Sequence, residues 1–93
     1  MRIAVLTVTL RAPWVHSLKE KRMEVRSLLA RVRNQFNVSA AESGAQDLHQ
    51  TIELSFAAIA GNSAQANSIL GHLLDFISGN TQAEIVNTQR EIY

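Results

Sequence analysis

Four cationic side chains recur at a spacing that an α-helix would align on one side. At about 100° per residue they fall within an arc of about 60°, and they are Lys19, Arg22, Arg26 and Arg33. Such a stripe would be about 20 Å long, enough to contact several phosphates of a nucleic acid. The alternative is a solvated helix face with some charges paired to acids of neighbouring elements. The spacing therefore predicts RNA contact, with plain solvation as the competing interpretation.

An indole, an imidazole and a guanidinium stand directly before this segment, at Trp14, His16 and Arg11. A tryptophan beside cations can stack on an unpaired base, as in proteins that read single-stranded RNA. A single tryptophan can equally pack over the open end of a hydrophobic core. We name the three residues as candidate RNA contacts, although for Trp14 itself we favour core packing.

The histidines and carboxylates do not form a recognisable catalytic or metal-binding pattern. No two of His16, His49 and His72 stand at the four-residue spacing of a helical ligand pair, and cysteine is absent. Glu42 and Asp47 flank a glycine-bearing turn, where acids ordinarily accept from backbone amides. Nucleophile elbows, Walker loops and G-x-G-x-x-G motifs are missing. We expect a protein that is not an enzyme and has no cofactor and no metal.

The composition is that of one folded domain whose positive charge is gathered in one segment. Hydrophobic residues make up 46% and charged residues 18% of the 93 residues, enough for a single core. Residues 17–34 hold six cations and two carboxylates, whereas the rest holds three cations and six carboxylates. The lack of cysteine fits a reducing compartment, and no apolar run approaches the ~20 residues of a membrane span. We expect a cytoplasmic protein.

Apolar periodicity predicts four strands and two helices that would position these residues. Residues 2–11 alternate and are rich in β-branched side chains, which indicates a strand. Ser17 and Glu20 form an S-x-x-E capping box at the start of a helix. The predicted strands span residues 2–11, 37–42, 50–60 and 82–92, and the helices run from residue 17 to about 34 and from about 62 to a stop at 79–80. In the turn after the second strand, Gly44 is expected to be free to take a positive φ.

The order β-α-β-β-α-β predicts an α+β, ferredoxin-like fold over residues 1–93, a single domain. Its four-stranded antiparallel sheet would carry both helices on one face. The other face would present four aliphatic residues, Ile3, Val5, Ala57 and Ile59. RNA-recognition motifs share this topology but place paired aromatic residues on that face, so their binding mode is not expected. An exposed aliphatic sheet more often pairs with another copy, which predicts a homodimer.

Several short motifs of the chain resemble those of one bacterial family. Residues 16–22, HSLKEKR, resemble the HSLK-[DE]-KR signature of the YlxP-like family, and residues 31–42, RVRNQFNVSAAE, resemble its RLRxRFNVSVAE. Residues 46–50, QDLHQ, are similar to its xDLWQ, and residues 90–92, REI, match its closing motif. The motifs follow the family order and span almost the whole chain. His49 departs from the family, which usually has tryptophan at that place.

The resemblance implies a ferredoxin-like fold in a bacterial protein of unsettled function. Relatives are often encoded beside translation initiation factor two and ribosome-binding factor A, which implies a role near the ribosome. Together with the cationic stripe, this predicts a non-catalytic RNA- or ribosome-associated factor. Two alternatives stay open. One is a homodimeric regulatory module that binds a small ligand at the seam between subunits, and the other is a protein-interaction subunit that docks through a sheet edge.

Overall fold

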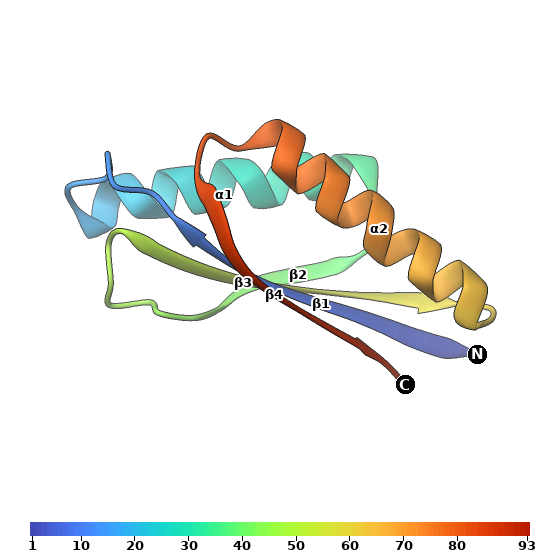
Figure 1. The fold of residues 1–93 in the computed structure, drawn as a ribbon. Helices are drawn as coiled ribbons and strands as arrows, with labels where there is room; N and C mark the ends of the chain where they lie inside the picture. The colour runs from blue at the N-terminus through green and yellow to red at the C-terminus, as the bar shows by residue number, and fades with distance from the viewer.

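The structure, a computed structural model, describes residues 1–93 and has the element order that the sequence predicts. The six elements are β1 (Arg2–Arg11), α1 (Leu18–Gln35), β2 (Ser39–Gly44), β3 (Thr51–Ala60), α2 (Ser63–Asn80) and β4 (Glu84–Ile92). The strands form one antiparallel sheet in the order β2-β3-β1-β4. Both helices cover the same face of this sheet (Figure 1). The fold is therefore α+β and ferredoxin-like.

The core lies between the sheet and the helices because alternate strand residues point toward the helix layer. Residues 4, 6, 8 and 10 of β1 and 52, 54, 56 and 58 of β3 are buried, whereas their odd-numbered neighbours are partly or fully exposed. The apolar stripe of α1 (Val25, Leu28, Leu29 and Val32) and that of α2 (Ala66, Leu70, Leu73 and Ile77) close over them. The open face of the sheet is left without a covering layer.

Both helices begin with the same arrangement of caps. The Ser17 side chain accepts from the Glu20 amide at 3.1 Å, and the Glu20 carboxylate accepts from the amide of His16 at 3.2 Å. At α2, Asn62 accepts from the Gln65 amide at 2.8 Å. These bonds satisfy amide groups that a helix start leaves without partners. The predicted capping box is confirmed. Its second hydrogen bond runs from the amide of His16, the residue before the cap, to the Glu20 carboxylate.

The second strand and the turn after it differ from the sequence prediction. The strand begins at Ser39 rather than at residue 37 and ends at Gly44. The positive φ occurs at Ala45 (55°) and not at Gly44. Gly44 lies opposite Glu53 at a register shift, where a Cβ would collide with the Glu53 side chain. The glycine leaves room for the Glu53 carboxylate in its present rotamer, and its own φ is not positive. Neither α1 nor α2 is long and apolar enough to cross a membrane.

Candidate functional site

The four cations of the predicted stripe lie exposed along α1, and we call them the basic ridge (Lys19, Arg22, Arg26 and Arg33). The structure contains a single ion pair, and it joins two other residues, Lys21 and Glu42. No carboxylate therefore neutralises the ridge. Arg22 and Arg26 are four residues apart on the helix, where like charges repel. The ridge is a concentrated and unpaired positive surface.

The ridge lies on the side of α1 that overhangs the edge strand β2. Arg33 donates from Nη2 to the carbonyl oxygen of Ala40 in β2. On the other side of the helix, Arg31 donates from Nη1 to the carbonyl oxygen of Asn80, at the end of α2, at 2.8 Å. These two contacts fix how α1 is rotated about its axis. The ridge consequently faces away from α2 and borders the outer edge of the molecule.

The three candidates before α1 do not join the ridge in one patch. Trp14 is 37% exposed and lines a cavity together with Glu24. Glu24 stands two residues before Arg26, about 200° away around the helix, so this cavity and the ridge lie on opposite sides of α1. Arg11 lies at a different place again, in a hollow of about 370 Å³ bordered by Asp47 and His49. His16 is exposed beside the helix start and is the closest of the three in sequence to Lys19.

The buried ammonium of Lys21 holds the loop between β2 and β3 against α1. Its side chain is 2% exposed, and Nζ lies 2.9 Å from Oε2 of Glu42. Nζ also donates to the carbonyl oxygens of Ala45 at 2.5 Å and Leu48 at 2.6 Å. The ammonium thus has two carbonyl acceptors and one carboxylate oxygen at ion-pair distance. We call this arrangement the Lys21 clamp.

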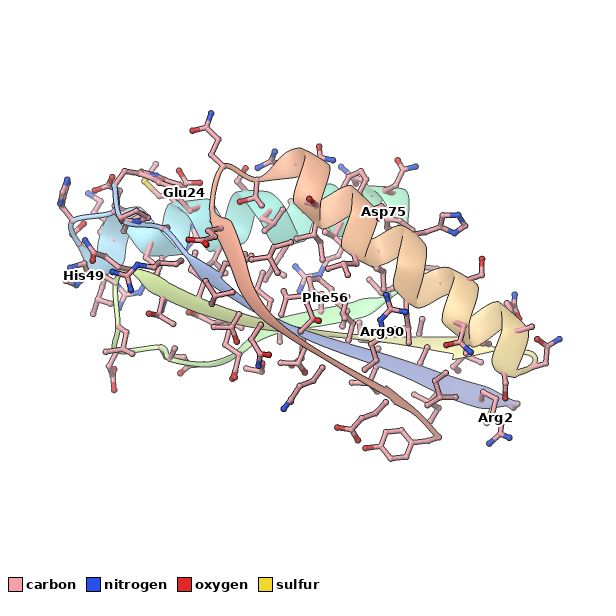
Figure 2. The ribbon with its side chains drawn as sticks, viewed as in Figure 1. Arg2, Glu24, His49, Phe56, Asp75 and Arg90 are labelled. Atoms are coloured by element: carbon pink, nitrogen blue, oxygen red, sulfur yellow. The ribbon has the colours of Figure 1, made fainter.

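Gln50 joins the same loop to the segment between β1 and α1. Its Nε2 donates to the carbonyl oxygens of Pro13 at 3.0 Å and Val15 at 3.2 Å. The two loops thus form one ordered end of the molecule, where Figure 2 shows His49. Leu48 is 56% exposed on this end. A single exposed leucine is ordinary on a protein surface and does not by itself indicate a binding site.

The charge count of residues 17–34 includes Lys21 only as one of six cations. A signal for its burial was nevertheless present. At about 100° per residue, Lys21 falls about 200° from Lys19, between the core residues Leu28 and Val32. A lysine in the middle of an apolar stripe needs a built set of acceptors. Its partners at residues 42, 45 and 48 were not predictable, because they depend on how the loop folds back.

The four residues of the predicted dimer face come together on the open face of the sheet. Ile3 pairs with Ile59 and Val5 pairs with Ala57 in the register of β1 and β3. Ile59 is 70% exposed and Ile3 is 40% exposed. Farther along the same face the residues are small and hydroxyl-bearing, with Thr7 and Ser55 hydrogen-bonded at 3.0 Å and Ser55 and Ser43 at 2.6 Å. The aliphatic part of the face is thus confined to one end.

The histidines, aspartates and glutamates do not gather into any group of three or more that could hold a metal ion. His16, His49 and His72 come from two loops and α2, and each is exposed. Ser68 and His72 approach at 3.4 Å on α2, one helical turn apart. This contact lies on the exposed surface of α2, outside the loops that Lys21 and Gln50 hold together.

Comparison with known proteins places the chain among relatives without an assigned activity. Residues 3–90 match a family model described as "Protein of unknown function (DUF503)". The chain is similar to the "Uncharacterized protein YlxP" of Bacillus subtilis (strain 168), with 39% identity over 75 residues. That alignment covers 81% of this chain and 82% of the relative.

Proposed function

The chain belongs to the DUF503 (YlxP-like) family, and on that premise we propose that it is a non-catalytic RNA- or ribosome-associated factor. The observation that carries the proposal is the basic ridge, which is exposed along α1 and has no carboxylate partner. Phosphate contacts from lysine and arginine supply most of the sequence-independent affinity for nucleic acid. The ridge supports phosphate contact rather than recognition of particular bases.

The charge arrangement of α1 is unfavourable in the isolated protein and favourable beside a polyanion. Arg22 and Arg26 repel each other at a spacing of four residues, by a few tenths of a kcal/mol. Lys19 precedes Arg22 by three residues and adds to the same field. A row of phosphates along the helix would turn this repulsion into attraction. The resemblance implies a role near the ribosome, where the backbone of ribosomal RNA would provide such a row of phosphates.

The test compares two double charge reversals that change the net charge by the same amount. Arg22→Glu/Arg26→Glu removes the middle of the ridge, and Arg2→Glu/Arg90→Glu removes two exposed arginines of the sheet (Figure 2). Binding is measured by anisotropy of a labelled oligoribonucleotide and by sedimentation with ribosomal subunits in sucrose gradients. The ridge variant should bind at least about tenfold more weakly and show a shallower salt dependence. The sheet variant should stay close to the wild type.

Three results would overturn the proposal. The first is an unchanged association of the ridge variant with RNA and with ribosomal subunits. The second is an equal loss in both variants, which would assign binding to overall charge rather than to the ridge. A wild-type affinity that does not fall with salt would contradict phosphate contact directly.

Self-association through the open sheet face is a second candidate function, and the register of Ile3 with Ile59 favours it. A contiguous patch of exposed aliphatic side chains often marks a protein–protein contact. The face and the ridge lie on different sides of the molecule, so a homodimer would leave both ridges open to RNA. Cytoplasmic location belongs to the same proposal, because a chain without cysteine suits a reducing compartment.

A further inference from the structure

A cavity of about 350 Å³ lies beyond the end of α2, where the helix layer is incomplete. α2 ends at Asn80, and the chain then descends to β4 through residues 81–83. α1 extends past this point, so that space remains between α1, the end of β1 and the start of β4 (Figure 1). Trp14, from the loop between β1 and α1, lines the same space. This size is at the lower end for ligand pockets in proteins.

The cavity has an apolar base and two charged residues of opposite sign. The base includes Leu10, Leu28 and Ile52, all of which belong to the core. Glu24 and Arg31 line the same cavity from α1, yet they do not form an ion pair. Figure 2 shows Glu24 on α1 close to the segment that leads into β4. Two opposite charges thus face one cavity without neutralising each other.

Arg31 is held so that part of its guanidinium stays available. Nη1 donates to the Asn80 carbonyl oxygen at 2.8 Å, and Nε and Nη2 donate to the Ser27 carbonyl and hydroxyl oxygens at 3.4 and 3.3 Å. Arginine has five N–H donors, so two are left for a ligand. The contacts with Ser27 also draw the guanidinium one turn back along α1, toward Glu24.

We propose that this cavity binds a free α-amino acid with an apolar side chain. The carboxylate of the amino acid would accept from the two remaining N–H groups of Arg31, since guanidinium and carboxylate match in shape and charge. The ammonium group would donate to Glu24. The apolar side chain would pack between the indole of Trp14 and the base of the cavity. A free amino acid with an apolar side chain thus has a group for each feature of the cavity: its ammonium for Glu24, its carboxylate for Arg31 and its side chain for the apolar base.

The site is separate from the basic ridge and from any seam between subunits. Glu24 and Arg31 lie on the side of α1 that faces α2, whereas the ridge borders β2. The cavity lies on the helix-covered side of the sheet, away from the open face that we propose as the dimer seam (Figure 1). Binding of an amino acid therefore does not depend on RNA binding or on dimer formation, and each can fail without the others.

The single tryptophan of the chain makes the proposal directly measurable. L-phenylalanine and L-leucine are titrated into the full chain while Trp14 emission is recorded, and calorimetry is run in parallel. Both should give saturable binding. Phenylalaninamide, which lacks the carboxylate, and N-acetylphenylalanine, which lacks the ammonium, should bind at least about tenfold more weakly. These analogues separate recognition of the two charges from simple burial of an aromatic ring.

Glu24→Gln tests the assignment on the protein side. Glu24 is exposed and has no hydrogen-bond or ion-pair partner, so its replacement should leave the urea midpoint unchanged. The variant should lose affinity for phenylalanine by about tenfold while its affinity for N-acetylphenylalanine stays the same. Asp75→Asn, an exposed carboxylate of α2 outside the cavity, is the matched control and should bind as the wild type does. Absence of any emission change or heat up to about 10 mM ligand, or wild-type affinity in Glu24→Gln, would overturn the proposal.

Discussion

The Lys21 ammonium is the one charged group that the fold fully buries, and its contacts reach Glu42 and two loop carbonyls. Lys21→Met keeps the apolar stem but removes the ion pair with Glu42 and the two hydrogen bonds to the loop carbonyls. The loss should destabilise the fold by about 3 kcal/mol, because Glu42 and the carbonyl oxygens of Ala45 and Leu48 lose their partner while they remain largely shielded from water. Urea unfolding, followed by circular dichroism, measures the change.

Two further variants show whether the clamp is the cause. Lys19→Met removes an exposed ridge cation from the same helix and should change stability by no more than about 0.5 kcal/mol. The double variant Lys21→Met/Glu42→Leu removes both charges and should recover part of the loss, since an apolar pair no longer leaves a carboxylate without its partner. Equal urea midpoints for Lys21→Met and Lys19→Met would show that the clamp contributes nothing to stability.

Tyr93 gives a second prediction at the scale of one residue. Its hydroxyl donates to the Glu91 carboxylate, and this hydrogen bond, together with the nearby negative charge, raises the pKa of the phenol above its ordinary value. The folded state favours the neutral phenol. The contact therefore contributes to folding stability below the ordinary pKa of tyrosine, and this contribution is lost as the pH rises through the raised pKa of Tyr93. Glu91→Gln should lower the pKa of Tyr93. Because the chain has one tyrosine, the ultraviolet absorbance of its phenolate reports the titration, and an unchanged midpoint would contradict the contact.

At the scale of the elements, the glycines of the chain have opposite requirements. Gly71 and Gly79 lie within α2, and a Cβ at either would meet open space. Gly71→Ala or Gly79→Ala should therefore stabilise the protein by about 0.5–1 kcal/mol, because alanine restricts the unfolded chain and favours the helix. Gly44→Ala should give no such gain, since the new Cβ would displace the Glu53 carboxylate from its present position. Thermal unfolding of the three variants checks the signs, and a stabilised Gly44→Ala would contradict the described packing.

The elements were predictable wherever a local pattern determines them. β1 and β3 alternate strongly. Ser17 indicates the start of α1, and Asn62 or Ser63 that of α2, so these bounds are predicted to within one residue. β2 was placed two residues early because its residues are small and polar on both faces, which leaves pairing with β3 to set its position. The predicted stop of α2 at residues 79–80 is confirmed by its end at Asn80, although no glycine of the chain has a positive φ.

The candidate site was predictable only along α1. Helical spacing placed Lys19, Arg22 and Arg26 on one side, and the structure shows them exposed there. No local sequence pattern indicates on which side of α1 the preceding loop passes. The separation of Trp14 from the ridge is therefore visible only in the structure, where Trp14 and Glu24 line the same cavity. The cavity was not predictable for the same reason. It exists because α2 ends at Asn80 while the first turns of α1 extend farther along the sheet (Figure 1).

At the scale of the whole molecule, the open sheet face is where a second copy would bind. Ile59 is 70% exposed beside its register partner Ile3, and covering such a pair removes apolar surface from water at about 25 cal/mol per Å². We expect wild-type protein at micromolar concentration to scatter light as a dimer and Ile59→Glu to scatter as a monomer. Urea unfolding of Ile59→Glu should show an intact fold, because the side chain is outside the core.

Met23→Glu is the matched control for this face. Met23 is 61% exposed, but it lies on α1, in the helix layer on the other side of the sheet (Figure 1). If the sheet face forms the seam, Met23→Glu stays dimeric, because a charge on the far layer meets only water. If Met23→Glu dissociates and Ile59→Glu does not, the seam lies on the helix layer and would cover part of the basic ridge. A wild-type protein that scatters as a monomer would remove the homodimer altogether and leave both faces of the molecule open to partners.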